Sequence, residues 1–381
     1  MPTVNSEYQI PMKRYSNLYE KIYDMNNLRL AHQHAKKGKG WYREVQEVDE
    51  NLDYYLEQLQ EMLINHTYHT SEYKVFHKKD GKKVRKIYKL PYFPDRICQW
   101  AILQVVEPCI INNLTTDTYS AIPKRGIHKG LQKLQGAMWN HPEECTYCLK
   151  LDARHYYQSI NHEILKEKYA RMFNDTDLLW LLSEIIDSIN TAEVEDLRAV
   201  YQGSDIDYST GIPIGNYLSQ YSGNFYLSAF DHWIKEEKHI KHYFRYMDDI
   251  VIFSESKEKL HTLKREIDDY LKDNLKLLVK DNWQVFPTFI RGVDFLGYRV
   301  FDKYTLVRKS TCKGMKRKML GILNKIKAGQ NMNYSEWCSI NSYNGWLNHA
   351  DTFRLFQKYI APLTQYAERF YLLNIRKVGI A

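Results

Sequence analysis

The alternation of apolar and polar residues predicts helices and a hairpin in the first third of the chain. Up to about Tyr73, apolar residues recur at helical spacing, as in VDENLDYYLEQLQEMLI. The stretch YKVFHKKDGKKVRKIYKL then predicts a β-hairpin that turns at Asp80 and Gly81, with lysines around the turn. A further helix is predicted from about Asp95, where apolar residues again share one face.

The middle of the chain predicts a sheet with helices between its strands. CTYCLKLDARHYY indicates a strand leading into the helix SINHEILKEKYARMF, and residues 176–207 indicate a helical stretch and then a polar loop. The loop GIPIGN opens a long helix, HYFRYMDDIVIF predicts two short strands about a tight turn, and SKEKLHTLKREIDDYLKDNLKLL predicts a helix with one apolar stripe. Two more strands follow around WQVFP and FLGYRVF. This order predicts an α+β fold, a sheet with helices on one face, related to the split βαβ plan.

Length and composition narrow the class of protein. The 381 residues are enough for two or three modest domains. No apolar run approaches the roughly 20 residues that span a bilayer, and the N-terminus lacks the apolar region of a signal peptide. Six scattered cysteines favour reduced thiols, so we expect a cytoplasmic protein without membrane contact. The pair Cys145 and Cys148 is expected to be buried thiols, with a metal site as the alternative.

Positive charge is concentrated towards the C-terminus. The whole chain has a net charge of +8, whereas Phe301 to Ala381 contains fourteen Lys and Arg against four Asp and Glu, a balance of +10. This segment is predicted to form a small basic helical bundle. Basic residues interleaved with 31 Tyr, 8 Trp and 14 Phe are typical of a nucleic-acid binder, although a solvated basic face explains the composition equally well.

Two adjacent acids interrupt a run of strand-forming residues. Asp248 and Asp249 follow Tyr246-Met247, and a hairpin tip would spare the sheet their desolvation. Aspartate is also common in ordinary turns. Asp152, however, ends another apolar strand, LKLD. If the two strands are neighbours, three carboxylates converge and could hold two divalent cations about 3.5–4 Å apart, the arrangement that promotes phosphoryl transfer.

Basic and glycine-rich segments could complete such a site. Arg85 and Lys86, on the lysine-rich hairpin, could bind phosphate, or could be two solvated residues. Asp95 and Arg96 favour a helix N-cap with an ion pair. The loop from Gly211 to Asn216 could admit a nucleotide backbone, although a plain turn is the commoner outcome.

Taken together, four motifs resemble the ordered palm motifs of reverse transcriptases from about Lys83 to Val307. They are YMDD; Leu151-Asp152 followed by Tyr157; GIPIG leading to Ser219-Gln220; and FLGY. Within that class the chain is most similar to the enzymes of diversity-generating retroelements, because Ile214 stands where group II intron and retroviral-type enzymes usually have Gln. This resemblance extends to about Phe356 through three further stretches, WQVFPTFIRGVDFLGYRVF, LVRKSTCKGMKRK and SYNGWLNHADTFRLF.

The resemblance implies a right-hand polymerase with a ferredoxin-like palm sheet and a helical thumb. Residues 1–145 would form N-terminal helices and fingers, and residues 146–300 the palm, with a fingers-like insertion at about 175–210. Residues 301–381 would form the basic thumb. No RNase H or endonuclease domain is expected after it.

The resemblance also implies roles for individual residues. Asp152 and Asp248 would bind two Mg²⁺ ions, or Mn²⁺, with Asp249 nearby and less essential. Tyr157 would be the steric gate against a ribose 2′-OH. The implied nucleotide-binding residues are Arg85, Lys86, Ala153, Tyr157, Ile214, Gly215 and Gln220. The implied primer grip is Phe295, Leu296, Gly297 and Tyr298. The implied duplex-binding residues of the thumb are Arg308, Lys309, Lys313, Lys316, Arg317 and Lys318.

The implied activity is RNA-directed DNA synthesis with frequent errors at adenines. The implied partners are template RNA, the RNA/DNA duplex, dNTPs and a small basic, oligomeric accessory protein. One alternative is an antiphage-defence or abortive-infection reverse transcriptase with the same palm. Another is a non-catalytic RNA-binding scaffold, which predicts a broken acidic set, whereas all three aspartates are present.

Overall fold

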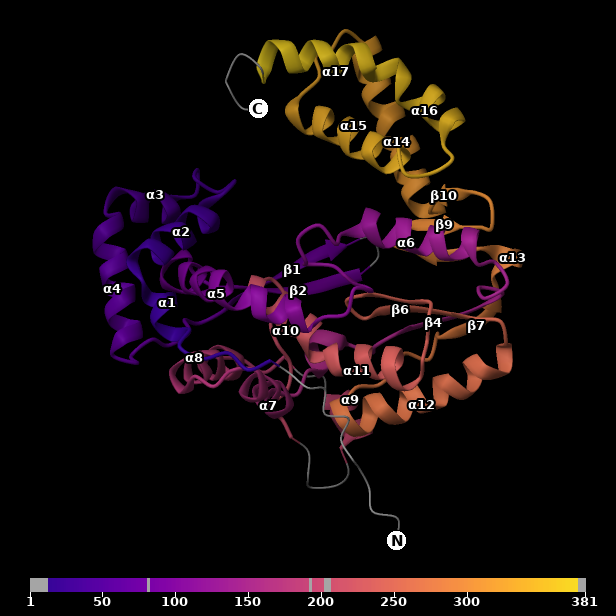
Figure 1. Cartoon of the computed structure of the whole chain (residues 1–381). Coiled ribbons are helices and arrows are strands. Elements are labelled where there is room, and N and C mark those ends of the chain that lie inside the picture. The colour runs from indigo at the N-terminus through magenta and orange to yellow at the C-terminus, as the bar shows by residue number, and fades with distance from the viewer. Residues whose placement is uncertain (1–12, 81–82, 192–193, 202–206, 376–381) are drawn as a thin grey trace. The chain divides into compact units, whose positions relative to one another are not determined.

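In the part of the N-terminal region that the structure describes, the chain forms four helices, as the sequence predicts (Figure 1). The computed structural model describes residues 13–80, 83–191, 194–201 and 207–375. Asp24 caps the second helix, because its carboxylate accepts hydrogen bonds from the backbone N–H groups of Asn26 and Asn27. The helices are α1 (Tyr19–Tyr23), α2 (Met25–Lys36), α3 (Arg43–Glu50) and α4 (Leu52–Ile64).

The predicted lysine-rich hairpin is confirmed in its two strands. β1 (Lys74–Asp80) and β2 (Lys83–Lys89) are antiparallel, and Lys78 lies opposite Arg85. The predicted turn residue Gly81 lies outside the described residues. Like charges directly opposite one another are unfavourable in a sheet.

A long buried helix, α5 (Ile97–Asn113), follows an irregular turn, η1 (Tyr92–Arg96), and packs against α2. The prediction that Asp95 caps this helix and pairs with Arg96 is wrong. Asp95 is fully buried and accepts hydrogen bonds from the Tyr68 hydroxyl at 2.9 Å and the Ser71 N–H at 3.0 Å. The carboxylate therefore accepts hydrogen bonds from residues that precede β1, and does not cap the helix.

Five strands form a sheet in the order β3-β5-β6-β4-β7. In chain order, β4 is followed by helices, then by β5 and β6, then by α12 and β7, which is the predicted β-α-β-β-α-β plan. β3 pairs in parallel with β5 at the edge. The strands are β3 (Thr118–Tyr119), β4 (Tyr147–Asp152), β5 (Tyr243–Tyr246), β6 (Asp249–Ser254) and β7 (Gln284–Pro287).

The helices around these strands bury their apolar faces. The predicted stripe of α12 (Lys257–Leu275) is confirmed, since Leu260, Leu263, Ile267, Leu271 and Leu275 are all buried. The predicted long helix after GIPIGN is divided at Leu227, where ψ is 0°, and its second part continues from α-helical into π-helical hydrogen bonding at Trp233. The described residues between β3 and β5 form the helices α6 (Ile127–Asn140), η2 (Tyr156–Ser159), α7 (His162–Met172), α8 (Thr176–Asp187), α9 (Val194–Val200), α10 (Tyr217–Tyr226), α11 (Ser228–His232) and η3 (Trp233–Glu237).

The C-terminal part contains a small sheet and the predicted helical bundle (Figure 1). The sheet has the order β10-β9-β8 and is antiparallel. FLGYRVF is therefore not one strand, as the pattern suggests, but two strands joined at Leu296 and Gly297. The elements are α13 (Thr288–Arg291), β8 (Val293–Phe295), β9 (Tyr298–Val300), β10 (Thr305–Val307), α14 (Lys309–Lys327), α15 (Tyr334–Leu347), α16 (Phe353–Tyr359) and α17 (Ala361–Asn374).

The chain divides into two compact units, each built from several segments. The first comprises residues 1–123, 150–250 and 261–283, and the second comprises residues 124–149, 251–260 and 284–381. Among the described residues, no helix combines the length and apolar character needed to cross a membrane. Cys145 and Cys148 are buried, as predicted.

Candidate active site

The candidate site is built around the turn between β5 and β6. Met247 has a φ of 55°, a conformation that tight two-residue hairpin turns require and that non-glycine residues rarely adopt. The predicted tight turn is therefore confirmed. Only Asp248 of the two acids lies in it, because Asp249 is already the first residue of β6. The prediction that both acids project from the tip needs this correction.

Asp152 and Asp248 come together, although 95 residues separate them in the sequence. Asp152 ends β4, which lies beside β6 in the sheet. Burial, and then the adjoining carboxyl of Asp152, raise the pKa of Asp248 well above the usual range of an aspartate. Asp248 therefore resists ionisation in this environment unless further positive charge is supplied.

Two lysines lie against the other carboxylate groups of the site. Lys280 forms an ion pair with Asp152, and its backbone N–H donates to the Asp152 carbonyl at 2.9 Å. Lys150 Nζ lies 3.3 Å from Asp249 Oδ1. The sequence reasoning missed both lysines. The signal for Lys150 was its position two residues before Asp152, which places both side chains on one face of β4.

The carboxylates of the site are chemically suited to binding divalent cations. Among the described residues, no group of three or more His, Cys, Asp and Glu side chains is arranged as a metal site. Asp152 Oδ1 is nevertheless buried and has no hydrogen-bond partner in the described part of the chain. Carboxylate oxygens are the ligands that Mg²⁺ and Mn²⁺ prefer, so Asp152 and Asp248 suit such ions.

Tyr157 lies beside these acids. Its hydroxyl is 3.7 Å from Met247 Sδ, in the turn that carries Asp248. Burial, and then the charge of Asp248, raise the pKa of the Tyr157 hydroxyl. The ring also approaches α10, where a Cβ at Gly223 would lie 3.6 Å from it. Ala153 is buried and bridges Val279. The structure thus places the Tyr157 ring next to Asp248.

The loop from Gly211 to Asn216 lies on the hairpin strand β2. The Ile214 carbonyl accepts a hydrogen bond from the Tyr88 N–H at 3.0 Å. Gly215 has a φ of 128°, and a Cβ there would lie 2.9 Å from the Tyr88 carbonyl oxygen. Only glycine fits this close approach without strain. Gln220 is exposed on α10.

Arg85 and Lys86 occupy opposite faces of β2, because successive strand residues alternate. Both are exposed. Arg85 shares its face with Ile87, whose Cγ2 atom would lie 3.3 Å from a Cβ at Gly215. The structure therefore puts Arg85, rather than Lys86, on the face that contacts the Gly215 loop.

The four residues of the predicted primer grip lie in the second unit. Phe295 and Tyr298 are fully buried, and both turn residues between them have positive φ, 53° at Leu296 and 85° at Gly297. A Cβ at Gly297 would lie 2.5 Å from the Trp346 ring, which also stacks on Tyr298. Leu296 is buried as well, so Gly297 is the one residue of the four that is partly exposed.

The predicted thumb residues lie at the start of α14 and along its first half. Three of them recur every four residues and are exposed: Lys309, Lys313 and Arg317. The buried side of the helix carries Met315, Met319 and Ile322. Lys316 lies over the Tyr359 ring, and Lys318 is also exposed. Arg308 pairs with Asp294.

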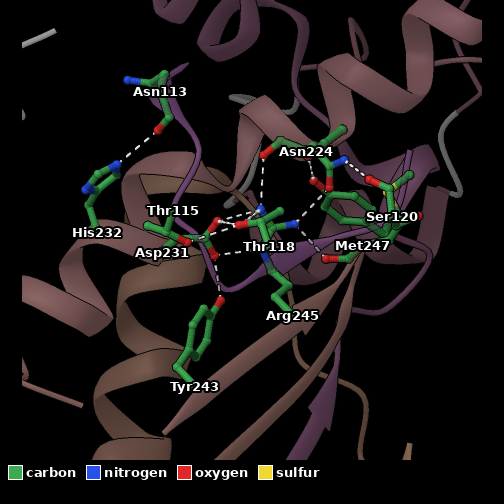
Figure 2. A network of polar contacts seen from close by, with 12 residues as sticks. Asn113, Thr115, Thr118, Ser120, Asn224, Asp231, His232, Tyr243, Arg245 and Met247 are labelled. Atoms are coloured by element: carbon green, nitrogen blue, oxygen red, sulfur yellow. Dashed lines mark hydrogen bonds and ion pairs between the residues drawn. The ribbon is translucent and has the colours of Figure 1, made fainter. Parts of the chain in front are cut away.

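A buried charge network supports the turn and was not foreseen from the sequence (Figure 2). Arg245 and Asp231 are fully buried and form a two-pronged ion pair, with Nε–Oδ1 at 2.6 Å and Nη2–Oδ2 at 2.5 Å. Arg245 Nη1 also donates to the Met247 carbonyl at 2.8 Å. Tyr243 donates to Asp231 at 2.5 Å. Arg245 thus fixes the backbone immediately before Asp248.

Comparisons with known proteins agree with this geometry. Residues 76–300 match the family model described as reverse transcriptase (RNA-dependent DNA polymerase). The chain is also similar to Protein YkfC of Escherichia coli strain K12, with 23% identity over 276 residues, which cover 64% of this chain and 70% of that protein. The range matched by the family model is more than half of the chain and contains Asp152, Tyr157 and Asp248.

Proposed function

Because this chain belongs to the reverse transcriptase family of RNA-dependent DNA polymerases, we propose that it copies a retroelement's template RNA into cDNA by two-metal phosphoryl transfer. The meeting of Asp152 and Asp248 beside Tyr157 is the observation that supports this most strongly. Reverse transcriptases generally use divalent metal ions. We propose the cytoplasm as its location, with residues 1–145 as N-terminal helices and fingers, 146–300 as palm and 301–381 as thumb.

The acids would hold two Mg²⁺ ions, with Mn²⁺ as a substitute. When bound, such ions activate the attacking hydroxyl and stabilise the leaving oxygen. Asp152 and Asp248 supply the carboxylates, and Asp249, already paired with Lys150, has the lesser role. Lys280 and Lys150 balance the negative charge of Asp152 and Asp249. Arg245 holds the Met247 carbonyl and thereby positions Asp248.

The incoming nucleotide would lie between Tyr157 and β2. The Tyr157 ring would lie under the sugar and exclude a 2′-OH, with the Ala153 backbone and Gln220 alongside. Arg85 is the better candidate for the triphosphate, because it shares its face of β2 with Ile87, which contacts the Gly215 loop. Lys86 is the alternative. The Leu296–Gly297 turn would support the primer end.

The proposed subtype is a diversity-generating retroelement enzyme that makes errors at template adenines. Ile214 supports this proposal, because a branched apolar side chain cannot make the hydrogen bonds that Gln would make. The proposed partner is a small basic, oligomeric accessory protein that binds the enzyme and its RNA. An antiphage-defence enzyme is the alternative, and a template and variable repeat pair beside the gene would separate the two. A non-catalytic scaffold is less well supported, because the acids are intact.

Replacing Ile214 by Gln is expected to lower misincorporation opposite template adenine about fivefold, the effect of one hydrogen bond worth about 1 kcal/mol. The Ile214 backbone contact with Tyr88 does not depend on the side chain, so the loop should persist. Sequencing of cDNA made on a defined RNA measures the error frequency. Ile214→Val, which stays apolar, is the control and should leave the frequency unchanged. An unchanged error frequency in Ile214→Gln would refute the role of Ile214.

The exposed basic face of α14 is expected to bind duplex phosphates. The double variant Lys313→Gln/Arg317→Gln should weaken binding of an RNA/DNA duplex and make the plot of log affinity against log salt shallower by about one for each phosphate that these side chains neutralise. Lys303→Gln removes an exposed charge outside α14 and is the control. A salt slope equal to that of the wild type in the double variant would exclude this face as the duplex-binding surface.

Primer extension tests the proposal as a whole. The purified protein, with an annealed DNA primer on RNA, should incorporate dNTPs with Mg²⁺ or Mn²⁺ and stop when EDTA is added. Extension on the native flanking RNA, compared with and without the accessory protein, tests the proposed subtype separately. Duplex binding without any incorporation, across both metals and both templates, would favour the scaffold.

A further inference from the structure

A buried histidine, His162, contacts the loop from Gly211 to Asn216 from behind. It is the first residue of α7, and its side chain is 1% exposed. Its Nδ1 atom lies 3.1 Å from Asp187 Oδ1, at the end of α8, and its Nε2 atom lies 3.0 Å from the Gly211 carbonyl oxygen. All three residues belong to the first compact unit. The imidazole therefore lies between a carboxylate and the backbone of the loop.

Both ring nitrogens of His162 face groups that accept hydrogen bonds. A carbonyl oxygen has no proton, so Nε2 must donate to Gly211. Asp187 also pairs with Lys166, at 2.9 Å between Nζ and Oδ2, and a carboxylate in an ion pair only accepts. Because hydrogen bonds to charged groups are stronger than neutral ones, Asp187 anchors the ring that donates to Gly211.

The backbone that follows Gly211 contacts both Tyr157 and the hairpin. The Ile212 N–H donates to the Tyr157 carbonyl at 2.8 Å. Two residues farther on, the Ile214 carbonyl accepts a hydrogen bond from the β2 backbone at 3.0 Å. The hydrogen bond from His162 to Gly211 therefore lies at the start of a segment whose other contacts reach the parts of the site proposed to surround the incoming nucleotide.

Burial makes the Gly211 carbonyl depend on its donor. Gly211, Ile212 and Pro213 are all buried, so water cannot take the place of a lost donor without movement of the loop. A buried carbonyl that loses its hydrogen bond is strongly unfavourable, and the backbone will shift to satisfy it. Such a shift would displace Ile212 from the Tyr157 carbonyl. Removing the donor is thus expected to change the shape of the loop.

We propose that His162 is a positioning residue for nucleotide binding, which fixes the Gly211 carbonyl and thereby places the loop and the Tyr157 backbone beside the incoming dNTP. This inference rests on the proposed polymerase function. It assigns to His162 an effect on dNTP binding and not on the phosphoryl transfer step. The reason is that His162 contacts the loop, whereas Asp152 ends β4 and Asp248 lies in the turn between β5 and β6.

Two amide substitutions separate the contacts of His162. His162→Gln places a donor where Nε2 lies and keeps the bond to Gly211, whereas His162→Asn places its donor where Nδ1 lies and keeps only the bond to Asp187. Steady-state extension of oligo(dT) on poly(rA) with Mg²⁺ measures kcat and the KM for dTTP. His162→Asn should raise KM about tenfold and change kcat less than about threefold, and His162→Gln should raise KM less than about threefold.

A matched control and a second variant support this comparison. His239→Asn, at an exposed histidine of the same unit, is the control and should leave both constants unchanged. Asp187→Ala tests the proposal if His162→Asn does not fold, since the Asp187 side chain is 46% exposed. It removes the anchor of the ring and should raise KM roughly threefold, less than His162→Asn, because the Gly211 carbonyl keeps its donor.

A wild-type KM in His162→Asn, or equal increases in KM in His162→Asn and His162→Gln, would overturn the proposal. So would a fall in kcat with an unchanged KM, because His162 would then act on the chemical step. Failure of the wild-type protein to extend the primer is a different result. It would refute the polymerase function itself, and this role of His162 with it.

Discussion

Asp248→Asn is expected to slow primer extension by roughly three orders of magnitude, because the substitution removes a charge that must face the metal ions while keeping the shape of the side chain. The stability of the fold should not decrease. The raised pKa of Asp248 means that its ionisation lowers the stability of the metal-free protein as pH rises above the usual aspartate range, and asparagine removes that loss. Steady-state extension rates and denaturation in EDTA measure the two effects.

Variants at two further aspartates test whether the loss of activity is specific to Asp248. Asp249→Asn should cause a smaller loss of activity, since Asp249 pairs with Lys150. Asp281→Asn, at an exposed acid, is the matched control and should extend primers as the wild type does. If Asp248→Asn extended primers at the wild-type rate with Mg²⁺, the proposed role of this carboxylate would have to be abandoned.

Asp231→Leu is expected to lower the free energy of unfolding by about 3–5 kcal/mol, because it leaves the fully buried Arg245 guanidinium without its counter-charge. The hydroxyls of Tyr243 and Thr118 would lose an acceptor as well. Chemical denaturation followed by circular dichroism measures this decrease in stability.

The double variant Asp231→Leu/Arg245→Met distinguishes the effect of an unpaired buried charge from the effect of losing the ion pair itself. Replacing both charges by apolar side chains should recover much of the stability, since no buried charge remains. It should nevertheless slow primer extension, because Arg245→Met removes the donor to the Met247 carbonyl next to Asp248. Glu255→Gln, which breaks the exposed pair with Lys259, is the control and should be nearly neutral. A single variant as stable as this control would show that the network is dispensable.

Local patterns predicted most of the elements correctly. The stripe of α12 and the strands about Met247 and Asp248 follow from periodicities of 3.6 and 2, which belong to the chain itself. The errors occurred where backbone conformation or distant segments intervened. FLGYRVF breaks into two strands because Leu296 and Gly297 adopt positive φ, and Asp95 accepts hydrogen bonds from Tyr68 and Ser71 instead of capping a helix.

The residues themselves singled out the acids of the candidate site, and the family resemblance added Tyr157. Asp152 and Asp248 could be singled out because carboxylates at strand ends are conspicuous. Their counter-ions could not, because lysines are frequent along the chain and nothing local distinguishes Lys280 from the others. Arg245 could not be singled out either, because nothing in its local sequence distinguishes it from other basic residues. Its importance comes from burial against Asp231, which lies on a different element.

The sequence by itself determined the helices, the strands, the basic character of the C-terminal segment and the acids available for chemistry, because each depends on residue type and short-range spacing. Only the tertiary structure decided which charges meet, and that His162 lies between Asp187 and the Gly211 carbonyl. The physical reason is that desolvation and ion pairing depend on neighbours in space. Those neighbours are supplied by chain segments that are far apart in the sequence.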